Sequence, residues 1–323
     1  MKKDLKTTMA NKAHEEIPGN PSVSTSSKQK LNDRSNGKPL QILSEEDWKF
    51  WMHNGYVVIK NAIPKAQAKA TADFIWEFDE KEANDPSTWY AQPRAEMKMK
   101  ELAGTGMVEA YNHQTLWNNR QTQKIYDAFV DVWGTEKLWV TIDRVNLNFP
   151  QRPGEEKEGF IHWDYDPETR PQNVQGVIAL ADQMDEKMGG FQCIPWLYRN
   201  YDSWKLTQPE DRDRFQPNLA ALHDKIVKVV MEAGDLLVFN STEPHGIRPN
   251  RSENKVRIAQ YISMMPAEEE NQELIDWRVN SWKNRIAPEG YAFPGDPRNW
   301  EQERYTRADL STLGKKLLGL NKW

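Results

Sequence analysis

From residue 138 onward the chain changes from helical to alternating periodicity, and this change constrains the fold more than any other feature of the sequence. Short apolar segments rich in Val, Ile and Leu recur at 138–148, 174–180, 227–231, 236–240 and 256–264. Segments of this length and composition are typical of β-strands. Gly-containing sequences such as Met188-Gly189-Gly190 lie between them and predict turns. Because helices do not alternate with these strands, the pattern predicts an antiparallel sandwich or barrel.

Helical periodicity precedes and follows this strand region. Ser44 stands before three acidic residues, and this arrangement predicts a helix that begins there and ends at Gly55. The apolar segment at 56–59 predicts a short strand. Further helices are predicted from Pro64 to about Ala83, from Gln121 to Trp133, and at 268–284. The chain is therefore expected to be mainly β with flanking helices.

Composition separates the two ends of the chain from its middle. Residues 1–38 are rich in Lys, Ser, Asn, Pro and Gly, and we expect a disordered tail because they offer little apolar surface to bury. Residues 39–270 are expected to form one domain, with a helical N-terminal part at 44–135 and a barrel at 138–266. Residues 267–323 are expected to form a helical and irregular extension that packs on the same domain.

Charge and cysteine content argue against several functional classes. The 323-residue chain has 43 Lys and Arg against 48 Asp and Glu, so its formal net charge is −5. Nucleic acid is not expected as a partner, because phosphate binding needs clustered basic residues. The one cysteine, Cys193, excludes an intrachain disulfide and fits a cytoplasmic location. The sequence lacks an apolar run of about 20 residues and a secretory signal, so no membrane partner is expected.

Two histidines and an aspartate form the strongest candidate for a metal site. The run from Gly159 to Tyr165 is predicted to be extended, and alternate side chains of a strand point to the same face. His162 and Asp164 can therefore reach one metal ion while Trp163 points away. His245 must then arrive from a different strand. Two imidazoles and one carboxylate hold a non-haem Fe(II) by one face and leave the opposite positions open for substrates.

Several motifs of the strand region resemble the phytanoyl-CoA dioxygenase family. The resemblance covers roughly residues 44–266 and is strongest from 138 onward, where the motifs follow the family's order. They are Val177–Asp182 with Met188–Pro195, Ala233–Asn240, Pro244–Gly246 with Pro249–Ser252, and Arg257–Ala259. Enzymes of this family are Fe(II)- and 2-oxoglutarate-dependent oxygenases. The resemblance therefore implies a double-stranded β-helix, which is a jelly-roll, cupin-like barrel.

The resemblance assigns roles to matching positions of this chain. His162 and Asp164 fall on the family's proximal His-x-Asp pair, and His245 falls on its distal histidine. Arg257 falls on the basic residue that binds the far carboxylate of 2-oxoglutarate. An arginine suits that role because its charge is permanent and its guanidinium can meet a carboxylate through two parallel hydrogen bonds. Arg248 and Arg251 lie closer to His245 in the sequence but in a predicted turn.

The chain also departs from the family's pattern. Asn148 stands where the family often carries a cosubstrate-binding lysine, so it can donate a hydrogen bond but brings no charge. Trp163 replaces the glutamine commonly found between the two proximal ligands, and Ile247 replaces a serine after the distal histidine. The usual Pro-Gly-Ser-His element reads Pro195-Trp196-Leu197-Tyr198. These differences imply a remodelled pocket around an unchanged ligand set.

The resemblance implies an enzyme that uses Fe(II), 2-oxoglutarate and O2. Such an enzyme hydroxylates or otherwise oxidises an unactivated C–H bond and releases succinate and CO2. Asp164 favours this oxidation over halogenation, because related halogenases replace the carboxylate with a small residue. Two alternatives remain open at this point. The same ligands could hold Zn(II) in a hydrolase, or the barrel could be catalytically silent and only bind a ligand.

Several aromatic and polar residues are candidate substrate contacts. The segment 196–225 is a predicted lid, and it contributes Trp196 and Tyr198. Tyr111 and Asn112 are expected to line the mouth of the site, and Trp163 is a further candidate. No basic cluster suits a CoA pyrophosphate, so a small molecule is favoured over an acyl-CoA. The protein is expected to be a cytoplasmic monomer or homodimer.

Overall fold

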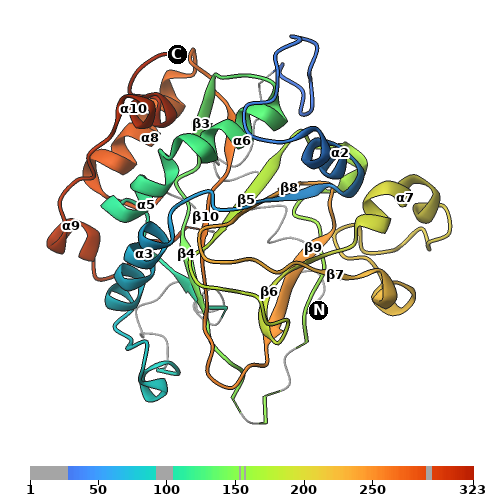
Figure 1. Cartoon of the computed structure of the whole chain (residues 1–323), viewed down its shortest axis with the longest axis horizontal. Helices are drawn as coiled ribbons and strands as arrows, with labels where there is room; N and C mark the ends of the chain where they lie inside the picture. Colours follow the sequence, from blue (N-terminus) through green and yellow to red (C-terminus); the bar gives the residue numbers. More distant parts are fainter. Residues whose placement is uncertain (1–27, 92–104, 153, 156–157, 289–292) are drawn as a thin grey trace.

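Two antiparallel sheets, a further pair of strands and the helices around them form the core of the part of the chain that can be described (Figure 1). The computed structural model describes residues 28–91, 105–152, 154–155, 158–288 and 293–323. Across these residues, none of the helices combines the length and the apolar character needed to cross a lipid bilayer.

The strands form a larger and a smaller sheet. The larger sheet has the spatial order β1 (Tyr56–Ile59), β8 (Leu236–Asn240), β5 (Val174–Ala179), β10 (Arg257–Tyr261), β4 (Val145–Asn148) and β2 (Met107–Val108). The smaller sheet has the order β7 (Val227–Lys228), β6 (Met188–Cys193) and β9 (His245–Asn250). A further pair joins β3 (Leu138–Val140) to β11 (Met264–Pro266). The two sheets face each other as in a double-stranded β-helix, so the predicted fold class is confirmed.

The helices lie before, between and after the strands. They are α2 (Glu45–Asn54), α3 (Lys65–Phe78), α5 (Gln114–Arg120), α6 (Gln123–Trp133), α7 (Pro195–Lys205), α8 (Gln272–Asn284), α9 (Trp300–Arg304) and α10 (Thr312–Leu318). Short 3-10 turns occur at Pro86–Thr88, Pro167–Thr169, Leu219–Ala221 and His223–Lys225. Local sequence explains both ends of α2. Ser44 and Asp47 cap each other's backbone N–H groups at 3.0 Å, and Gly55 ends the helix at a φ of 72°.

Strand alternation divides the core into two layers. Ile178 on β5 belongs to the large cluster between the sheet and the helices, which also includes Phe129 of α6. Val177 and Ala179 belong instead to the cluster between the two sheets, together with Phe191 of β6. Because both faces of β5 are buried, its sequence is apolar almost throughout. Side chains on the second face point toward the space in which the site lies.

Several element boundaries differ from their predictions. The predicted strand at 138–148 is broken at 141–144, since its two ends pair with β11 and β10 in different sheets. The predicted helix from Pro64 ends at Phe78, five residues before Ala83, and α5 was not predicted. Met188–Gly190 is not a turn. These residues begin β6, where Met188 and Gly190 pair with β9. Gly189 and Gly190 take φ angles of 82° and 105° there, which glycine adopts without steric cost.

Part of the segment that was expected to be disordered, residues 28–38, makes defined contacts with the domain. Residues 1–27 lie outside the described residues, whereas residues 28–38 contact the C-terminal end of α6. Asn32 donates its backbone N–H to Val132 O at 2.8 Å, and its side chain accepts a hydrogen bond from Trp51 Nε1 at 2.7 Å. The prediction of disorder is wrong for residues 28–38, because these hydrogen bonds and the packing of Leu31 against the core hold the segment in place.

The C-terminal segment is tied to the domain through buried polar side chains. Arg278 on α8 is fully buried and donates to Val140 O at 2.5 Å and to Leu317 O at 2.9 Å. Trp282 Nε1 donates to Ala308 O at 3.0 Å. These bonds hold α8 and α10 against β3, as Figure 1 shows for the red and orange helices.

Candidate metal centre

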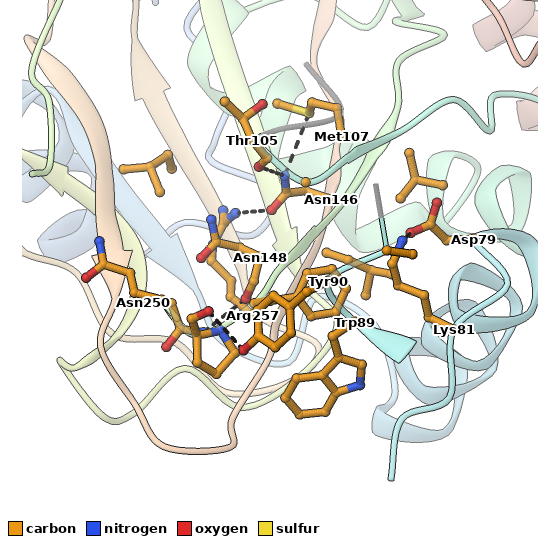
Figure 2. A pocket seen from close by; sticks show the side chains of 18 of the residues that line it. Asp79, Lys81, Trp89, Tyr90, Thr105, Met107, Asn146, Asn148, Asn250 and Arg257 are labelled. Carbon is orange, nitrogen blue, oxygen red and sulfur yellow. Dashed lines mark hydrogen bonds and ion pairs between the residues drawn. The ribbon is translucent and has the colours of Figure 1, made fainter. Parts of the chain in front are cut away.

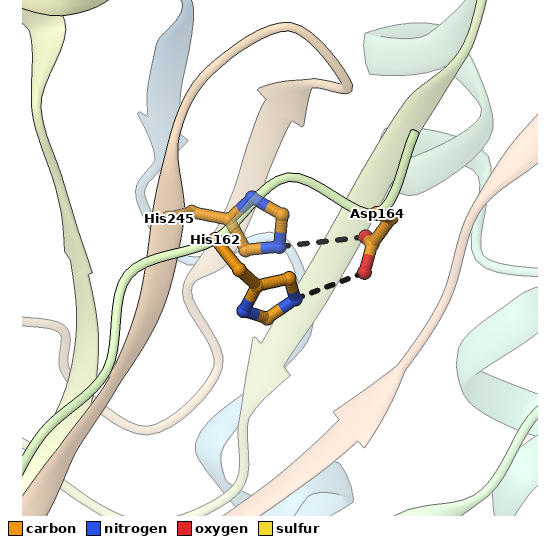
Figure 3. Close-up of side chains that lie close together, drawn as sticks. All are labelled: His162, Asp164 and His245. Atoms are coloured by element: carbon orange, nitrogen blue, oxygen red, sulfur yellow. Dashed lines mark hydrogen bonds and ion pairs between the residues drawn. The ribbon is translucent and has the colours of Figure 1, made fainter. Parts of the chain in front are cut away.

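The structure brings His162, Asp164 and His245 together, as Figure 3 shows. One ligand atom from each of the three side chains lies within 4.8 Å of the others. His162 Nε2 is 3.0 Å from Asp164 Oδ1, and His245 Nε2 is 3.5 Å from Asp164 Oδ2. Such spacing matches three donors that converge on one ion of the first transition row.

A backbone contact, rather than a full strand, brings the two histidines side by side. His162 donates its N–H to His245 O at 2.8 Å, and His245 donates to His162 O at 3.0 Å. The predicted extended run around His162 therefore contributes a single bridge to β9. Gly246 makes this approach possible, since a Cβ there would lie 1.7 Å from Phe160 O. A larger residue would push the two ligand-bearing segments apart.

The surroundings of the triad orient its ligand atoms. The Nδ1 of His245 lies 3.0 Å from Glu243 O, which suits an Nδ1–H donor and leaves Nε2 with a lone pair for a metal. The His245 ring packs between Phe191 and Phe239, with centroids 5.8 Å and 4.5 Å away. Burial raises the pKa of Asp164, but the adjacent imidazoles of His162 and His245 outweigh this effect and hold the pKa well below its usual range. The carboxylate is therefore charged and available to a cation.

Gln175 is a neighbour of the triad that the sequence analysis missed. It lies on β5, on the same face as Val177 and Ala179, and points into the space between the sheets. Its Nε2 donates to Asp164 Oδ2 at 2.5 Å. This bond holds one carboxylate oxygen and thereby orients the other. A lone glutamine in an apolar strand offers no spacing signal from which this contact could be predicted.

Arg257 is fully buried on β10 and has one free donor group. Its Nη1 donates to Asn146 Oδ1 at 3.0 Å, and its Nε donates to Gln183 Oε1 at 3.3 Å. Its Nη2 has no hydrogen-bond partner among the residues that the structure describes. A buried guanidinium that lacks an acidic partner is costly unless an anion joins it. The free Nη2 of Arg257 is therefore suited to bind the carboxylate of a ligand.

Asn148 pairs with Arg257 in the register of β4 and β10. The oxygen of its side-chain amide is buried and has no partner among the described residues. An amide oxygen and nitrogen can exchange places by a flip, so this group can instead offer two donors to a carboxylate. Arg248 does not compete with Arg257 for this role. It donates to Gly189 O at 2.6 Å and to Phe191 O at 2.5 Å, and so ties β9 to β6.

A cavity of about 1140 Å³, part of whose lining Figure 2 shows, lies next to the segment that carries His162, although none of the three triad residues lines it. Arg257, Asn148 and Phe160 contribute to its wall. Phe160 connects the cavity to the triad, because its ring stacks on His162 at 5.1 Å. Ile247 makes a second connection, since alternate residues of β9 share the face that carries His245.

The structure places three of the predicted substrate contacts away from this cavity. Trp163 is 1% exposed, packs on Tyr201 of α7 and donates from Nε1 to Thr242 O at 3.0 Å. It points away from the triad because the ligands on either side of it point inward. Trp196 and Tyr198 lie on α7, which packs against α2 and does not line the cavity. α7 therefore does not cover this cavity, and the rest of the predicted lid at 196–225 stays a prediction.

Tyr111 and Asn112 are buried and fix the C-terminal segment instead of lining a mouth. Their backbone N–H groups donate to the Glu301 carboxylate at 2.8 Å and 2.6 Å. The Asn112 side chain donates to Ser281 O at 3.1 Å. Neither residue lines the cavity, because α8 and α9, far away in the sequence, cover both of them.

Glu301→Gln is expected to change how stability depends on pH. Burial raises the pKa of Glu301 to about 7 from a usual 4.5, against the opposing effect of the Tyr111 and Asn112 N–H groups. Between these pH values the folded protein keeps a proton that the unfolded chain has released. The free energy of unfolding therefore falls as the pH rises through this window, by about 3 kcal/mol in total. Glutamine does not titrate, so the variant should lose this decrease.

Chemical denaturation at several pH values from 4 to 8 measures the effect. Glu303→Gln, at an exposed position of the same helix, is the control and should keep the wild-type pH dependence. An identical decrease in Glu301→Gln and wild type would contradict the assignment.

Comparisons of sequence and structure place the chain among known proteins. The sequence profile of the phytanoyl-CoA dioxygenase family matches residues 51–259. The Aspergillus versicolor Ava biosynthesis cluster protein O is 24% identical over 246 residues, which cover 68% of this chain and 77% of that protein. A Dictyostelium discoideum protein provisionally described as a phytanoyl-CoA dioxygenase is 24% identical over 325 residues, covering 85% and 86% of the two chains.

A solved structure shares the fold over most of the chain. The crystal structure of the Candida albicans GlcNAc Inducible Gene 2 protein matches with a TM-score of 0.62 at 14% sequence identity. The match covers 87% of this chain and 77% of that chain. At this identity the likeness concerns the fold alone.

Proposed function

The chain belongs to the phytanoyl-CoA dioxygenase family, and we propose that it hydroxylates or otherwise oxidises an unactivated C–H bond of a small molecule. Family membership and the donor set of His162, Asp164 and His245 together indicate Fe(II)- and 2-oxoglutarate-dependent chemistry. The reaction would consume O2 and release succinate and CO2. The observation that carries the proposal is this triad, set beside a cavity whose wall contains a buried arginine with a free donor.

Each residue has a defined task in this proposal. His162, Asp164 and His245 would hold the iron by one face. When bound, iron supplies with O2 and 2-oxoglutarate the oxidising power that breaks the C–H bond. Arg257 Nη2 and the Asn148 amide would bind the far carboxylate of 2-oxoglutarate, which satisfies polar atoms that are otherwise buried without partners. Phe191 and Phe239 pack on His245 and keep water from that side of the centre.

Conversion of 2-oxoglutarate to succinate under controlled metal and oxygen tests the proposal. We expect turnover with Fe(II) and O2, and none when Zn(II) replaces iron or when oxygen is removed. A Zn-dependent hydrolase would be active with Zn(II) and would not need oxygen. A catalytically silent barrel would bind 2-oxoglutarate without forming succinate. Either of these results, or no binding of 2-oxoglutarate at all, would refute the dioxygenase.

Gln175→Leu is expected to weaken iron binding without removing a ligand. The substitution keeps the approximate size of the side chain but removes the donor that fixes Asp164 Oδ2. Loss of such an outer partner typically lowers metal affinity or activity about 10- to 100-fold. Titration of the apoprotein with Fe(II) under anaerobic conditions measures the affinity.

Gln272→Leu is the matched control for this substitution. Gln272 lies exposed on α8, where its amide contacts Asp276, so its loss should leave iron affinity unchanged. If Gln175→Leu and wild type bound iron with equal affinity, the hydrogen bond from Gln175 would not be needed to orient Asp164.

A further inference from the structure

The cavity exposes an aromatic ring directly beside the triad. Phe160 is 48% exposed, although most large apolar side chains of this chain are buried. Its ring lies 5.1 Å from the His162 ring at an interplanar angle of 28°, and it lines the cavity. The tight packing of Gly246 on Phe160 O fixes the backbone from which this ring projects. A ligand that covered Phe160 would bury apolar surface next to the reacting centre.

A group of three aromatic side chains forms a second apolar surface of the same cavity. Trp89 and Phe149 stack with centroids 5.7 Å apart at 24°, and Tyr90 lies 6.2 Å from Phe149. Trp76 supports Trp89 from 6.1 Å away. The group is already assembled, so a flat ligand would meet a surface that does not need to rearrange. We call Trp89, Tyr90 and Phe149 the aromatic wall; Figure 2 labels Trp89 and Tyr90.

The polar atoms of the aromatic wall are used within the protein. Trp89 Nε1 donates to Glu82 O at 2.8 Å, and Tyr90 Oη donates to Pro150 O at 3.1 Å. Neither group is therefore free to select a polar substituent of a substrate. What the wall offers is ring surface that is already partly covered. Lys81 Nζ lies 5.5 Å from the Phe149 ring centroid, and the Arg152 guanidinium lies 5.6 Å from the Tyr90 ring centroid.

Ion pairs also occupy most charged side chains around the cavity. Lys81 pairs with Asp79, and Arg152 pairs with Glu155 at 2.9 Å. Arg298 pairs with Asp296 at 2.8 Å and with Glu80 at 3.0 Å; all of these residues line the cavity. A charged substrate group would have to compete with these pairs.

Four further charged groups line the cavity. Glu109 pairs with Arg144 at 3.3 Å, and Arg248 donates to two backbone carbonyl groups of β6. Glu158 also lines the cavity, but it is exposed to solvent, where an ionic contact contributes little. The free Nη2 of Arg257 is assigned to the cosubstrate. Among the described residues, the cavity therefore offers a substrate aromatic surface, whereas its charged groups are paired, bonded to backbone carbonyls, exposed to solvent or assigned to the cosubstrate.

We propose that the substrate is an uncharged molecule of two or more fused or linked rings, which lies against Phe160 and the aromatic wall. This inference rests on the proposed function, because it assumes that the cavity beside the triad receives the substrate. The size of the cavity agrees with it. Its volume of about 1140 Å³ slightly exceeds the range of ~300–1,000 Å³ that is usual for drug-sized ligands, and so leaves room for 2-oxoglutarate as well.

Binding of four probes to the protein loaded with Fe(II) and 2-oxoglutarate, without oxygen, tests the proposal. The probes are 2-naphthol, the anion 2-naphthoate, the cation 2-naphthylmethylammonium and the flexible alcohol decan-1-ol. By calorimetry we expect 2-naphthol to bind at least about tenfold more tightly than the other three, since it alone combines rings with neutrality. Equal or tighter binding of a charged probe, or of decanol, would overturn the proposal.

Two variants locate the binding site. Phe160→Ala and Phe149→Ala should each weaken 2-naphthol binding about tenfold. Phe50→Ala is the matched control, because Phe50 is 44% exposed and does not line the cavity, and it should leave binding unchanged. Iron content of each variant shows whether the triad is intact. Unchanged affinity in both cavity variants with normal iron content would refute this binding site.

Succinate formation, measured separately, distinguishes failure of this inference from failure of the proposed function. If the protein turns over 2-oxoglutarate but does not prefer 2-naphthol, the substrate class alone is wrong. If 2-naphthol binds as expected without any turnover, the cavity has the proposed selectivity and the dioxygenase assignment fails.

Discussion

Asp164→Ala is expected to abolish the Fe(II)-dependent conversion of 2-oxoglutarate to succinate. Asp164 supplies the one carboxylate of the triad, and its low pKa keeps it charged. Loss of an outer-shell partner typically costs about 10- to 100-fold in metal affinity or activity, so loss of a direct ligand should cost at least about 100-fold. Succinate formation and iron content per chain measure the two consequences together.

Asp166→Ala is the matched control for this variant. Asp166 lies two residues further along, caps a 3-10 turn and pairs with Arg214 at 3.1 Å, so its loss should leave iron content unchanged. Retention of both iron and turnover by Asp164→Ala would show that the carboxylate is not a ligand and would remove the basis of the proposed function.

Arg257→Ala is expected to raise the 2-oxoglutarate requirement steeply while iron stays bound. The guanidinium is fully buried and none of its described contacts is a carboxylate, so the cosubstrate would supply its counter-charge. Removal of one partner of a buried ion pair costs about 3–5 kcal/mol. This energy corresponds to a loss of cosubstrate affinity of about 10² to 10³-fold or more. The KM for 2-oxoglutarate and the iron content are the measurements.

Two further substitutions separate charge from geometry at this position. Arg257→Lys keeps the charge but loses the planar fork, so it should recover only part of the affinity. Arg251→Ala removes an exposed arginine that is nearer to His245 in the sequence, and it should have no effect. If Arg257→Ala bound 2-oxoglutarate as well as wild type, another residue would have to bind the carboxylate.

Periodicity and family resemblance together predicted the fold class, because the strands have buried faces that the sequence must keep apolar. Periodicity and resemblance gave wrong element boundaries where the backbone conformation could not be predicted from residue types. Gly189 and Gly190 have the sequence of a turn, yet their left-handed φ angles occur inside β6, where it passes close to Arg248. The break at 141–144 could likewise not be predicted from the sequence. The segments before and after it are both apolar, although β3 pairs with β11 and β4 pairs with β10 in a different sheet.

The metal-binding residues were easier to identify than the residues around them. His162, Asp164 and His245 carry a recognisable spacing and chemistry, and the structure brings them together. Gln175 and Phe160 carry no such signal, since their positions depend on the packing of strands that are distant in the sequence. Tyr111 and Asn112 were misplaced for the same reason. Only the folded chain brings Glu301 onto their backbone.

The close contact between Gly246 and Phe160 O has a consequence for how such a protein can diverge. The backbones of two of the three ligands, His162 and His245, are joined by main-chain hydrogen bonds, so the distance between these backbones depends little on the surrounding side chains. Mutations in the walls beside them can therefore accumulate while the ligands keep their positions. A lineage that retains this one glycine is free to explore new substrates without first rebuilding its reactive centre.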